Sequence, residues 1–293
     1  MTGGPLAQEL SAQAATDPLT QAVAELTQAY QTGRPCPPLR ERLLPPGDLT
    51  TAYAVQRAQL RRWLAEGRRL VGAKIGLTNP AVQRQLGVDQ PDFGVLTADM
   101  AVPDGEQVAL AEMLQPRVEA EVAFVLGADL DLPHPTTVDL IRAVDHLLPA
   151  IEIVDSRIAD WDISIVDTVA DNASSGKFVL GTRPVRLSEV DLRTCGMVLE
   201  HAGRPVSVGA GAACLGNPLH ALAWLAGTLA QAGNPLRAGD VVLSGALGPM
   251  VPVTPHAAYE ARISGLGAVR VRFDGGAGDG PGRAAGEGKA GGA

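Results

Sequence analysis

The sequence predicts an α+β protein in which a helical N-terminal region precedes a mixed, mostly antiparallel β-roll or barrel-like domain. Two helical patterns come first, and short extended runs separated by Gly, Pro and Asp turns follow from residue 70 onward. Helices do not alternate regularly with these runs, as they would in a doubly wound parallel sheet. We therefore expect the helices and the sheet to be largely segregated along the chain.

Two amphipathic helices are predicted in the N-terminal region. The first covers about residues 18–31, where apolar residues recur at spacings of four, three and four. A Pro-rich link follows, and a second helix begins near Asp48 or Thr50, either of which can cap it, and stops before Gly67. The predicted apolar face of this second helix consists of Ala52, Val55, Leu60, Trp63 and Leu64.

The remaining elements follow in order along the main part of the chain. Strands are predicted over residues 70–75, 118–126, 150–154, 178–181, 197–201, 241–244 and 268–273. Helices are predicted over residues 80–86, 137–143 and 219–232. The Gly/Ala-rich end offers too little apolar surface to offset its ordering entropy. We therefore divide the chain into a helical region (1–68), a main domain (69–274) and a disordered tail (275–293).

Composition excludes several classes of function. The 293 residues include 24 basic and 32 acidic side chains, giving a formal charge of −8, and only 3% are aromatic. Such a chain lacks the basic surface and stacking rings that nucleic-acid binding requires. Its strongest apolar run, about residues 219–230, is too short to cross a bilayer, and its first ten residues lack a secretory-signal pattern. Three cysteines without a CxxC pair indicate reduced thiols, so we expect a cytoplasmic protein.

A pair of glutamates is the first candidate for chemistry. Glu119 and Glu121 lie two residues apart on a predicted strand, so both carboxylates project from one face. Their mutual repulsion can be relieved in two ways. The strand face is solvated and Arg117 is the partner, or the carboxylates bind a divalent cation, which prefers oxygen ligands. The pair alone leaves both explanations open.

A third carboxylate favours the cation. Glu152 lies within the apolar segment 149–154, which should be largely buried. A buried, unpaired glutamate is costly and needs a cation, a hydrogen-bond partner or a proton. Arg157 could supply a salt bridge, although Asp155 could occupy that arginine instead. Because no His or Cys lies at ligand spacing, three glutamates suit Mg²⁺ or Mn²⁺ better than zinc.

Three further titratable residues precede the glutamates. Lys74 occupies a glycine-flanked apolar strand end, a setting that catalytic lysines favour, and a surface lysine is an equal alternative. Asp89 and Asp92 lie in a loop whose shape Pro91 and Gly94 fix, and an ordinary acidic turn would have the same composition.

Two polar loops are candidates for binding an anion. Residues 167–176 form an Asn/Ser-rich stretch that includes Ser174. Residues 244–249 contain a serine and two glycines, and this loop exposes backbone amides able to meet a carboxylate. Either loop could equally be a plain turn. The sequence shows no nucleophile elbow and no Gly-rich phosphate loop.

Together these segments resemble the 2-keto-4-pentenoate hydratase (2-hydroxypentadienoate hydratase) family of the fumarylacetoacetate hydrolase-like superfamily. The resemblance extends from about Asp48 to Phe273 and is carried by residues 71–78, 85–94, 116–124, 151–157, 167–176, 214–219 and 244–250. It implies a fold of the fumarylacetoacetate hydrolase type. It also implies that Glu119, Glu121 and Glu152 hold Mg²⁺ or Mn²⁺, which chelates the C1 carboxylate and C2 oxygen of the substrate.

The reaction that the resemblance implies is hydration of 2-hydroxypenta-2,4-dienoate to 4-hydroxy-2-oxopentanoate, in the meta-cleavage degradation of aromatic compounds. Lys74 would act as an acid/base or enolate-stabilising residue, with Asp92 and Asp89 in proton transfer. Ser174 would bind the substrate or orient water. Further substrate-binding candidates in the matching segments are Leu77, Gly245 and Ala246.

The resemblance leaves alternatives. A 2-oxo-3-hexenedioate (4-oxalocrotonate) decarboxylase shares the metal motif, dioate hydratases come next, and an inactive metal-binding scaffold is the non-enzymatic alternative. Lys177 stands where many relatives would have an apolar or small residue, and it would select a dianionic substrate if it pointed inward. We expect a homo-oligomer that binds a small anionic 2-hydroxydienoate or 2-oxo acid, with a pathway enzyme as a candidate partner.

Overall fold

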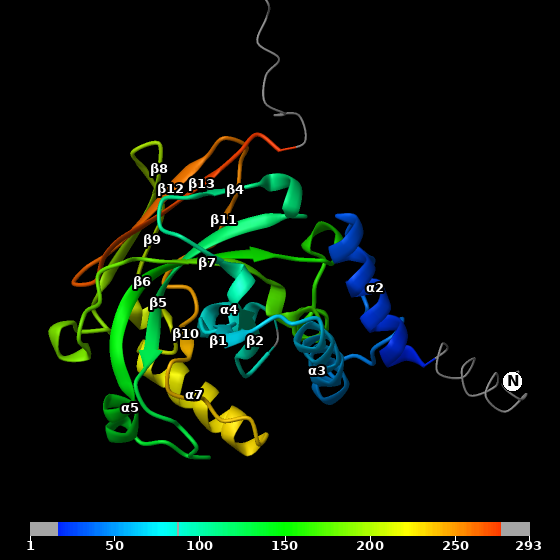
Figure 1. The fold of residues 1–293 in the computed structure, drawn as a ribbon, viewed down its shortest axis with the longest axis horizontal. Coiled ribbons are helices and arrows are strands. Elements are labelled where there is room, and N and C mark those ends of the chain that lie inside the picture. The colour runs from blue at the N-terminus through cyan, green and yellow to red at the C-terminus, as the bar shows by residue number, and fades with distance from the viewer. Residues whose placement is uncertain (1–16, 87, 277–293) are drawn as a thin grey trace, which may run out of the picture.

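The computed structural model describes residues 17–86 and 88–276. The N-terminal region contains α2 (Pro18–Thr32), capped by Asp17, and α3 (Leu49–Ala65), capped by Asp48. Both predicted helices are confirmed to within two residues, because their caps and stops are local signals. The two helices pack together at one end of the molecule (Figure 1). The disordered tail predicted over 275–293 lies outside the described residues except for its first two positions.

The buried face of α3 differs from the prediction. Leu64 is 44% exposed, whereas Gln56 and Gln59 are buried. The Gln56 side-chain amide donates to the carbonyls of Phe93 and Val169, and that of Gln59 donates to Ala170. Because a buried amide with satisfied hydrogen bonds is tolerated, the polarity of these glutamines does not identify their face.

The large sheet is mixed and mostly antiparallel, as predicted. Its strand order is β2-β1-β10-β5-β6-β7-β3, with β11 paired to β5. In this sheet, as far as the described residues show it, only the β1–β10 and β3–β7 pairs are parallel. Its strands are β1 (Leu70–Gly76), β2 (Asp92–Thr97), β3 (Ala101–Val102), β5 (Pro116–Leu126), β6 (Val144–Asp155), β7 (Ser175–Leu180), β10 (Val241–Leu243) and β11 (Val251–Pro252).

A second sheet covers one face of the first and encloses the main core with it. Its order is β4-β13-β12-β8-β9, and Figure 1 shows it lying across the curled large sheet. Its strands are β4 (Gln107–Val108), β8 (Gly196–His201), β9 (Arg204–Ala210), β12 (Ala258–Ile263) and β13 (Gly267–Phe273). Side chains such as Phe124 and Ile151 of the large sheet and Val269 of the second share this core.

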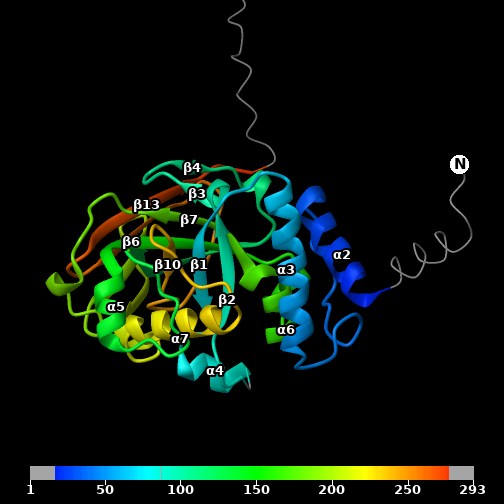
Figure 2. The same ribbon diagram turned by 60° about the horizontal axis from the view of Figure 1, so that its bottom comes forward.

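The described residues contain four further α-helices. The predicted helices are present as α4 (Pro80–Leu86), α5 (Thr137–Ala143) and α7 (Pro218–Gln231), whereas α6 (Ile165–Ala170) was predicted as loop. Figure 2 shows α5 and α7 together, with α6 beside α3. Among residues 17–86 and 88–276, no helix has the length and apolarity needed to span a membrane. The three cysteines are buried and unpaired, namely Cys36, Cys195 and Cys214.

Candidate metal centre and active site

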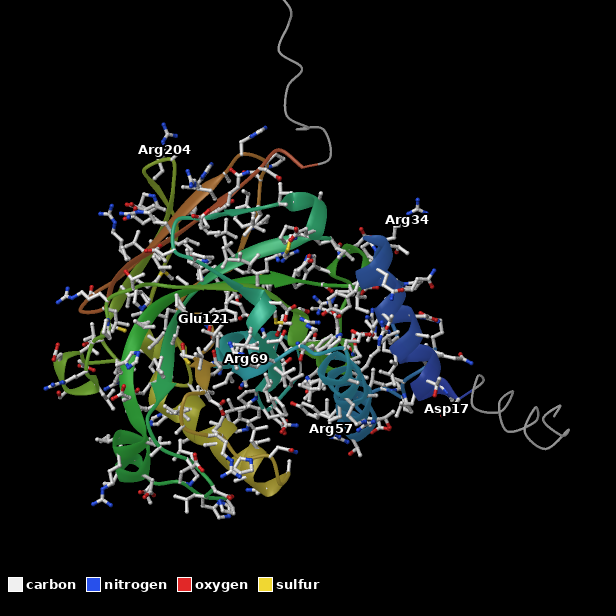
Figure 3. All side chains as sticks on the ribbon, in the orientation of Figure 1. Asp17, Arg34, Arg57, Arg69, Glu121 and Arg204 are labelled. Carbon is white, nitrogen blue, oxygen red and sulfur yellow. The ribbon has the colours of Figure 1, made fainter. Side chains whose placement is uncertain are left out.

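The structure brings the three glutamates together on one face of the large sheet. Glu119 and Glu121 lie on β5, and the β5–β6 register sets Glu152 directly opposite Glu119. One carboxylate oxygen from each lies within 4.8 Å of the other two. Glu121 and Glu152 are buried and Glu119 is half-buried. In Figure 3, Glu121 lies inside the curled sheet, whereas Arg34 and Arg204 project from the periphery.

Because side chains alternate between the two faces of β5, the three glutamates lie on the face opposite the main core. Val118, Ala120 and Val122 project to the opposite face and join the core shared with the second sheet. The glutamate face instead carries a smaller apolar cluster composed of Leu96, Met100, Ala123, Leu148, Ala150, Phe178 and Leu243. The carboxylates therefore lie in apolar surroundings, where ionisation is costly.

The carboxylates of Glu121 and Glu152 lack enough partners among residues 17–86 and 88–276. Glu121 Oε2 accepts the Gly245 N–H at 2.8 Å, but Glu121 Oε1 and Glu152 Oε2 are buried and accept no hydrogen bond from the described residues. Burial, reinforced by the charge of Glu152, raises the pKa of Glu119 to about 7 and that of Glu121 well above its usual range. Three close carboxylates, two of them under-bonded, form the all-oxygen donor set that Mg²⁺ or Mn²⁺ takes, so these residues fit a divalent cation.

Lys74 lies on the same face as the glutamates. Its Nζ is 3.1 Å from Glu152 Oε1, and the side chain is buried. Burial alone would lower the pKa of Lys74, but the carboxylates of Glu152 and Asp92 outweigh it and raise the pKa above its usual value. The strand-end lysine is therefore a charged, buried group beside the glutamates, and the surface alternative is wrong.

The structure separates the two aspartates of the predicted acidic loop. Asp92 begins β2 opposite Gly76, two residues from Lys74 along β1, so it shares the face of Lys74. It is buried, and its oxygens accept no hydrogen bond of ordinary geometry from the described residues. Burial raises its pKa to about 6, although Lys74 opposes the shift. Asp89 is exposed, in contrast to the buried Asp92.

The turns after β1 and β10 meet beside Glu121. Gly245 has φ 93°, and a Cβ there would lie 2.3 Å from Thr78 Oγ1, so this position requires glycine. Its amide donates to the carboxylate of Glu121, so this backbone N–H helps to hold that side chain in place. Leu77 (φ 55°) and Ala246 are both half-buried in these two turns.

Ser174 lies in a strained turn before β7. Asn172, Ala173 and Ser174 all adopt left-handed φ angles of 52°, 51° and 54°, each costing roughly 1–2 kcal/mol for a residue with a Cβ. The Asn172 side chain bonds both the N–H and the carbonyl of Val95, and the Ser175 hydroxyl donates to the Asn172 carbonyl. The Ser174 hydroxyl is buried without a partner among the described residues, so it is free to bind a ligand.

The arginine considered for Glu152 has another partner. Arg157 Nε lies 2.5 Å from Asp171 Oδ1, and both side chains are fully buried. Asp155 accepts the backbone N–H groups of Leu114 and Gln115. The sequence alone offers Glu152 and Asp155 as partners for Arg157, whereas Asp171 lies 14 residues further along in a polar stretch, where no local signal marks it as the partner.

The other two positively charged side chains considered near the site also have partners elsewhere. Arg117 stacks on the Trp161 ring, with its Cζ 4.3 Å from the ring centroid. Lys177 pairs with Ile153 in the β6–β7 register, so its side chain lies on the face opposite Glu152. Its Nζ lies 3.1 Å from Glu112 Oε2. The idea that Lys177 selects a dianionic substrate is therefore wrong.

Comparison with known proteins identifies the class and then the family. Residues 69–274 match the family model described as fumarylacetoacetate (FAA) hydrolase C-terminal. The chain is 58% identical over 252 residues to 2-keto-4-pentenoate hydratase 2 of Dechloromonas aromatica, covering 86% of this chain and 96% of the relative. It is 54% identical to 2-keto-4-pentenoate hydratase of Paraburkholderia xenovorans, covering 87% and 94%. The chain therefore belongs to the 2-keto-4-pentenoate hydratase family of the fumarylacetoacetate hydrolase-like superfamily.

A solved structure supports the same fold. The 4-oxalocrotonate decarboxylase of Pseudomonas putida G7, complexed with magnesium and adipate, is 38% identical to this chain with a TM-score of 0.81. The match covers 86% of this chain and 97% of that structure. The α+β prediction of fumarylacetoacetate hydrolase type is thereby confirmed.

Proposed function

We propose that the protein is a metal-dependent hydratase that converts 2-hydroxypenta-2,4-dienoate to 4-hydroxy-2-oxopentanoate. The cluster of Glu119, Glu121 and Glu152 carries the proposal, because the three carboxylates lie close together and the two buried ones, Glu121 and Glu152, have oxygens that lack hydrogen-bond donors among the described residues. The relatives that are 54–58% identical are named hydratases, whereas the decarboxylase is 38% identical. These identities favour hydration over decarboxylation and over an inactive scaffold.

The three glutamates would hold Mg²⁺ or Mn²⁺. When bound, the metal ion supplies Lewis-acid stabilisation of the negative charge that develops on the substrate's enolate oxygen. The apolar cluster beside the glutamates limits water around the carboxylates and so strengthens electrostatic interactions there.

The reaction requires two proton movements near the metal ligands. Ketonisation moves a proton from the C2 hydroxyl to C5, and hydration then places OH on C4 and H on C3. Lys74 is the proposed proton donor and enolate-stabilising cation, since its ammonium lies beside Glu152. Asp92, whose raised pKa of about 6 lies near neutrality, is the proposed proton-transfer partner.

Ser174 is the proposed group that binds the substrate or orients the attacking water, since its buried hydroxyl has no partner among the described residues. Leu77 and Ala246 are proposed to line the substrate site from the two turns beside Glu121. Asp89, which is exposed, is not assigned a role. We further propose that the protein is cytoplasmic, since its three unpaired cysteines suit a reducing compartment. We also propose that it forms a homo-oligomer.

A substrate assay separates the candidate reactions. The protein loaded with Mg²⁺ should consume 2-hydroxypenta-2,4-dienoate, with loss of dienol absorbance and a product whose mass equals the substrate plus one water. The same protein should release no CO₂ from 2-oxo-3-hexenedioate. Release of CO₂ without hydration of the dienoate would instead favour the decarboxylase, and no change in either substrate would favour the scaffold.

Metal removal should destabilise the protein more at pH 8 than at pH 6. Without a metal, burial raises the pKa values of Glu119 and Asp92 from 4.5 and 3.8 to about 7 and about 6. The folded state therefore holds protons that the unfolded state has released, so the free energy of unfolding falls as pH rises through this interval. A bound cation offsets this loss because it compensates the ionised carboxylates.

Thermal unfolding with Mg²⁺ and with excess chelator measures this effect. The melting temperatures should differ by at least about 5 °C at pH 8, and by less at pH 6, where protons compete with the metal. An equal difference at the two pH values would show that the carboxylate cluster is not the site of the metal effect.

A further inference from the structure

The guanidinium of Arg157 holds both ends of the turn that carries Ser174. Its Nη2 donates to the Asp171 carbonyl at 2.5 Å, just before the turn, and its Nη1 donates to the Ser175 carbonyl at 2.8 Å, just after it. The Asp171 carboxylate accepts from both the Arg157 Nε and the Arg157 backbone N–H. A fourth hydrogen bond of the guanidinium itself, from Nη1 to the Asp155 carbonyl, ties it back to the end of β6.

The turn needs this support because of its backbone. Three successive residues with side chains, Asn172 to Ser174, hold left-handed conformations that persist only where the surroundings over-determine them. The Asn172 side chain fixes the turn to β2 through Val95. Arg157 supplies the corresponding attachment on the β6 side, so the turn is held from two strands.

The turn packs directly on the proposed active-site face. A Cβ at Gly94 would lie 2.3 Å from the Asn172 carbonyl oxygen and 2.6 Å from Ser175 Oγ. Gly94 lies opposite Lys74 in the β1–β2 register and two residues from Asp92 on the same strand. The turn therefore sits over the strand pair that carries Lys74 and Asp92, and Ser174 is 3% exposed with its hydroxyl unpartnered among the described residues.

The N-terminal helical region covers the guanidinium. The Tyr30 ring of α2 lies 4.5 Å from Arg157 Cζ, and Trp63 of α3 packs edge-on against Tyr30 with ring centroids 5.9 Å apart. These rings exclude water from the ion pair between Arg157 and Asp171, which strengthens its hydrogen bonds. Helices remote from the glutamates are thus connected to the turn through one buried arginine.

We propose that Arg157 is a positioning residue that orients the Ser174 hydroxyl toward the substrate. Tyr30 of the N-terminal region covers the guanidinium of Arg157 and keeps water away from it. This inference rests on the proposed function in so far as Ser174 contacts the substrate. Arg157 itself touches neither the glutamates nor the substrate. Its effect on turnover should therefore pass through Ser174 and disappear when the Ser174 hydroxyl is absent.

A double-mutant cycle on the metal-loaded protein tests the proposal, with Arg157→Lys, Ser174→Ala and the double variant. Lysine keeps a positive charge beside Asp171 but cannot donate to both flanking carbonyls at once. The readouts are kcat/KM for 2-hydroxypenta-2,4-dienoate and, independently of turnover, calorimetric affinity for the non-reactive 2-oxopentanoate in the presence of Mn²⁺. Arg237→Lys is the matched control, since Arg237 pairs with Asp129 on the surface.

Each single variant should lower kcat/KM by roughly 10- to 100-fold, and the double variant should lie within about threefold of Ser174→Ala. Mn²⁺ affinity should stay within about twofold of the wild type in all variants, as should kcat/KM of Arg237→Lys. Losses that multiply in the double variant would overturn the proposal, because a purely structural role acts equally in both backgrounds.

Two provisions keep the cycle decisive. If Arg157→Lys does not fold, Asp171→Asn replaces it, since it loosens the guanidinium while leaving every carbonyl acceptor in place; the same non-additivity with Ser174→Ala is expected. If the wild type does not hydrate the dienoate, the proposed function fails. The same double-mutant cycle, measured as affinity for 2-oxopentanoate, then still decides whether Arg157 acts through Ser174. Independent losses of affinity in the two single variants would refute that role of Arg157.

Discussion

Replacing Glu121 with glutamine is expected to lower kcat/KM by at least about 1000-fold and to abolish tight binding of Mg²⁺ or Mn²⁺. Glutamine has the same shape and can still accept the Gly245 N–H through its side-chain oxygen. The substitution therefore removes charge from the cluster with little change in geometry. Kinetics with the dienoate and calorimetric Mn²⁺ titration measure the two effects.

Loss of folding would not explain this result. The pKa of Glu121 is raised well above its usual range by burial and by Glu152, so its ionised form destabilises the metal-free protein. Metal-free Glu121→Gln should consequently melt at a higher temperature than the metal-free wild type at pH 8. Glu25→Gln, which alters a surface ion pair with Arg42, is the matched control and should retain activity and Mn²⁺ binding. Normal turnover by Glu121→Gln would refute the assigned ligand.

Replacing Lys74 with methionine should lower kcat by roughly 100- to 10,000-fold, the range typical of losing a positioned acid or base. Methionine preserves most of the apolar stem in this buried position. Mn²⁺ should still bind, because Glu152 loses a competing cation and keeps its place opposite Glu119. Single-turnover kinetics and Mn²⁺ calorimetry on the same preparation separate this catalytic loss from loss of metal.

Lys177→Met is the matched control for Lys74→Met. Lys177 is also on a strand of the large sheet, but its side chain lies on the face opposite Glu152 and pairs with Glu112. Its replacement should change kcat by less than about twofold. Equal losses in the two variants would contradict a specific role for Lys74.

Much of the fold follows from local signals in the sequence. The caps Asp17 and Asp48 determine the starts of α2 and α3, and the alternation of β5 predicts that Glu119 and Glu121 share a face. The β12 strand was missed although Tyr259, Ala261 and Ile263 alternate with polar or exposed residues, a signal that was present. The β2 strand was missed for a different reason: its start reads as a Pro/Asp/Gly loop, and pairing with β1 overrides that composition.

The candidate site was predictable in its residue types but not in its geometry. An isolated glutamate in a buried strand identifies Glu152 as needing a partner, yet only the β5–β6 register shows that it faces Glu119. Arg157 and Asp171 lie 14 residues apart in the sequence, and nothing local excludes Glu152 as the partner of Arg157. Of the three left-handed residues in the turn at Ser174, only Asn172 is of a type that favours positive φ, so the sequence signals this turn only weakly.

The most direct test is a Mn²⁺ titration of the metal-free protein in which bound metal and turnover of 2-hydroxypenta-2,4-dienoate are measured on the same samples. We expect activity to be absent in excess chelator and to rise in proportion to bound Mn²⁺, reaching its maximum at about one ion per chain, as one cluster of three glutamates predicts. Full turnover by the chelated protein, or metal binding without any gain in hydration, would contradict the account.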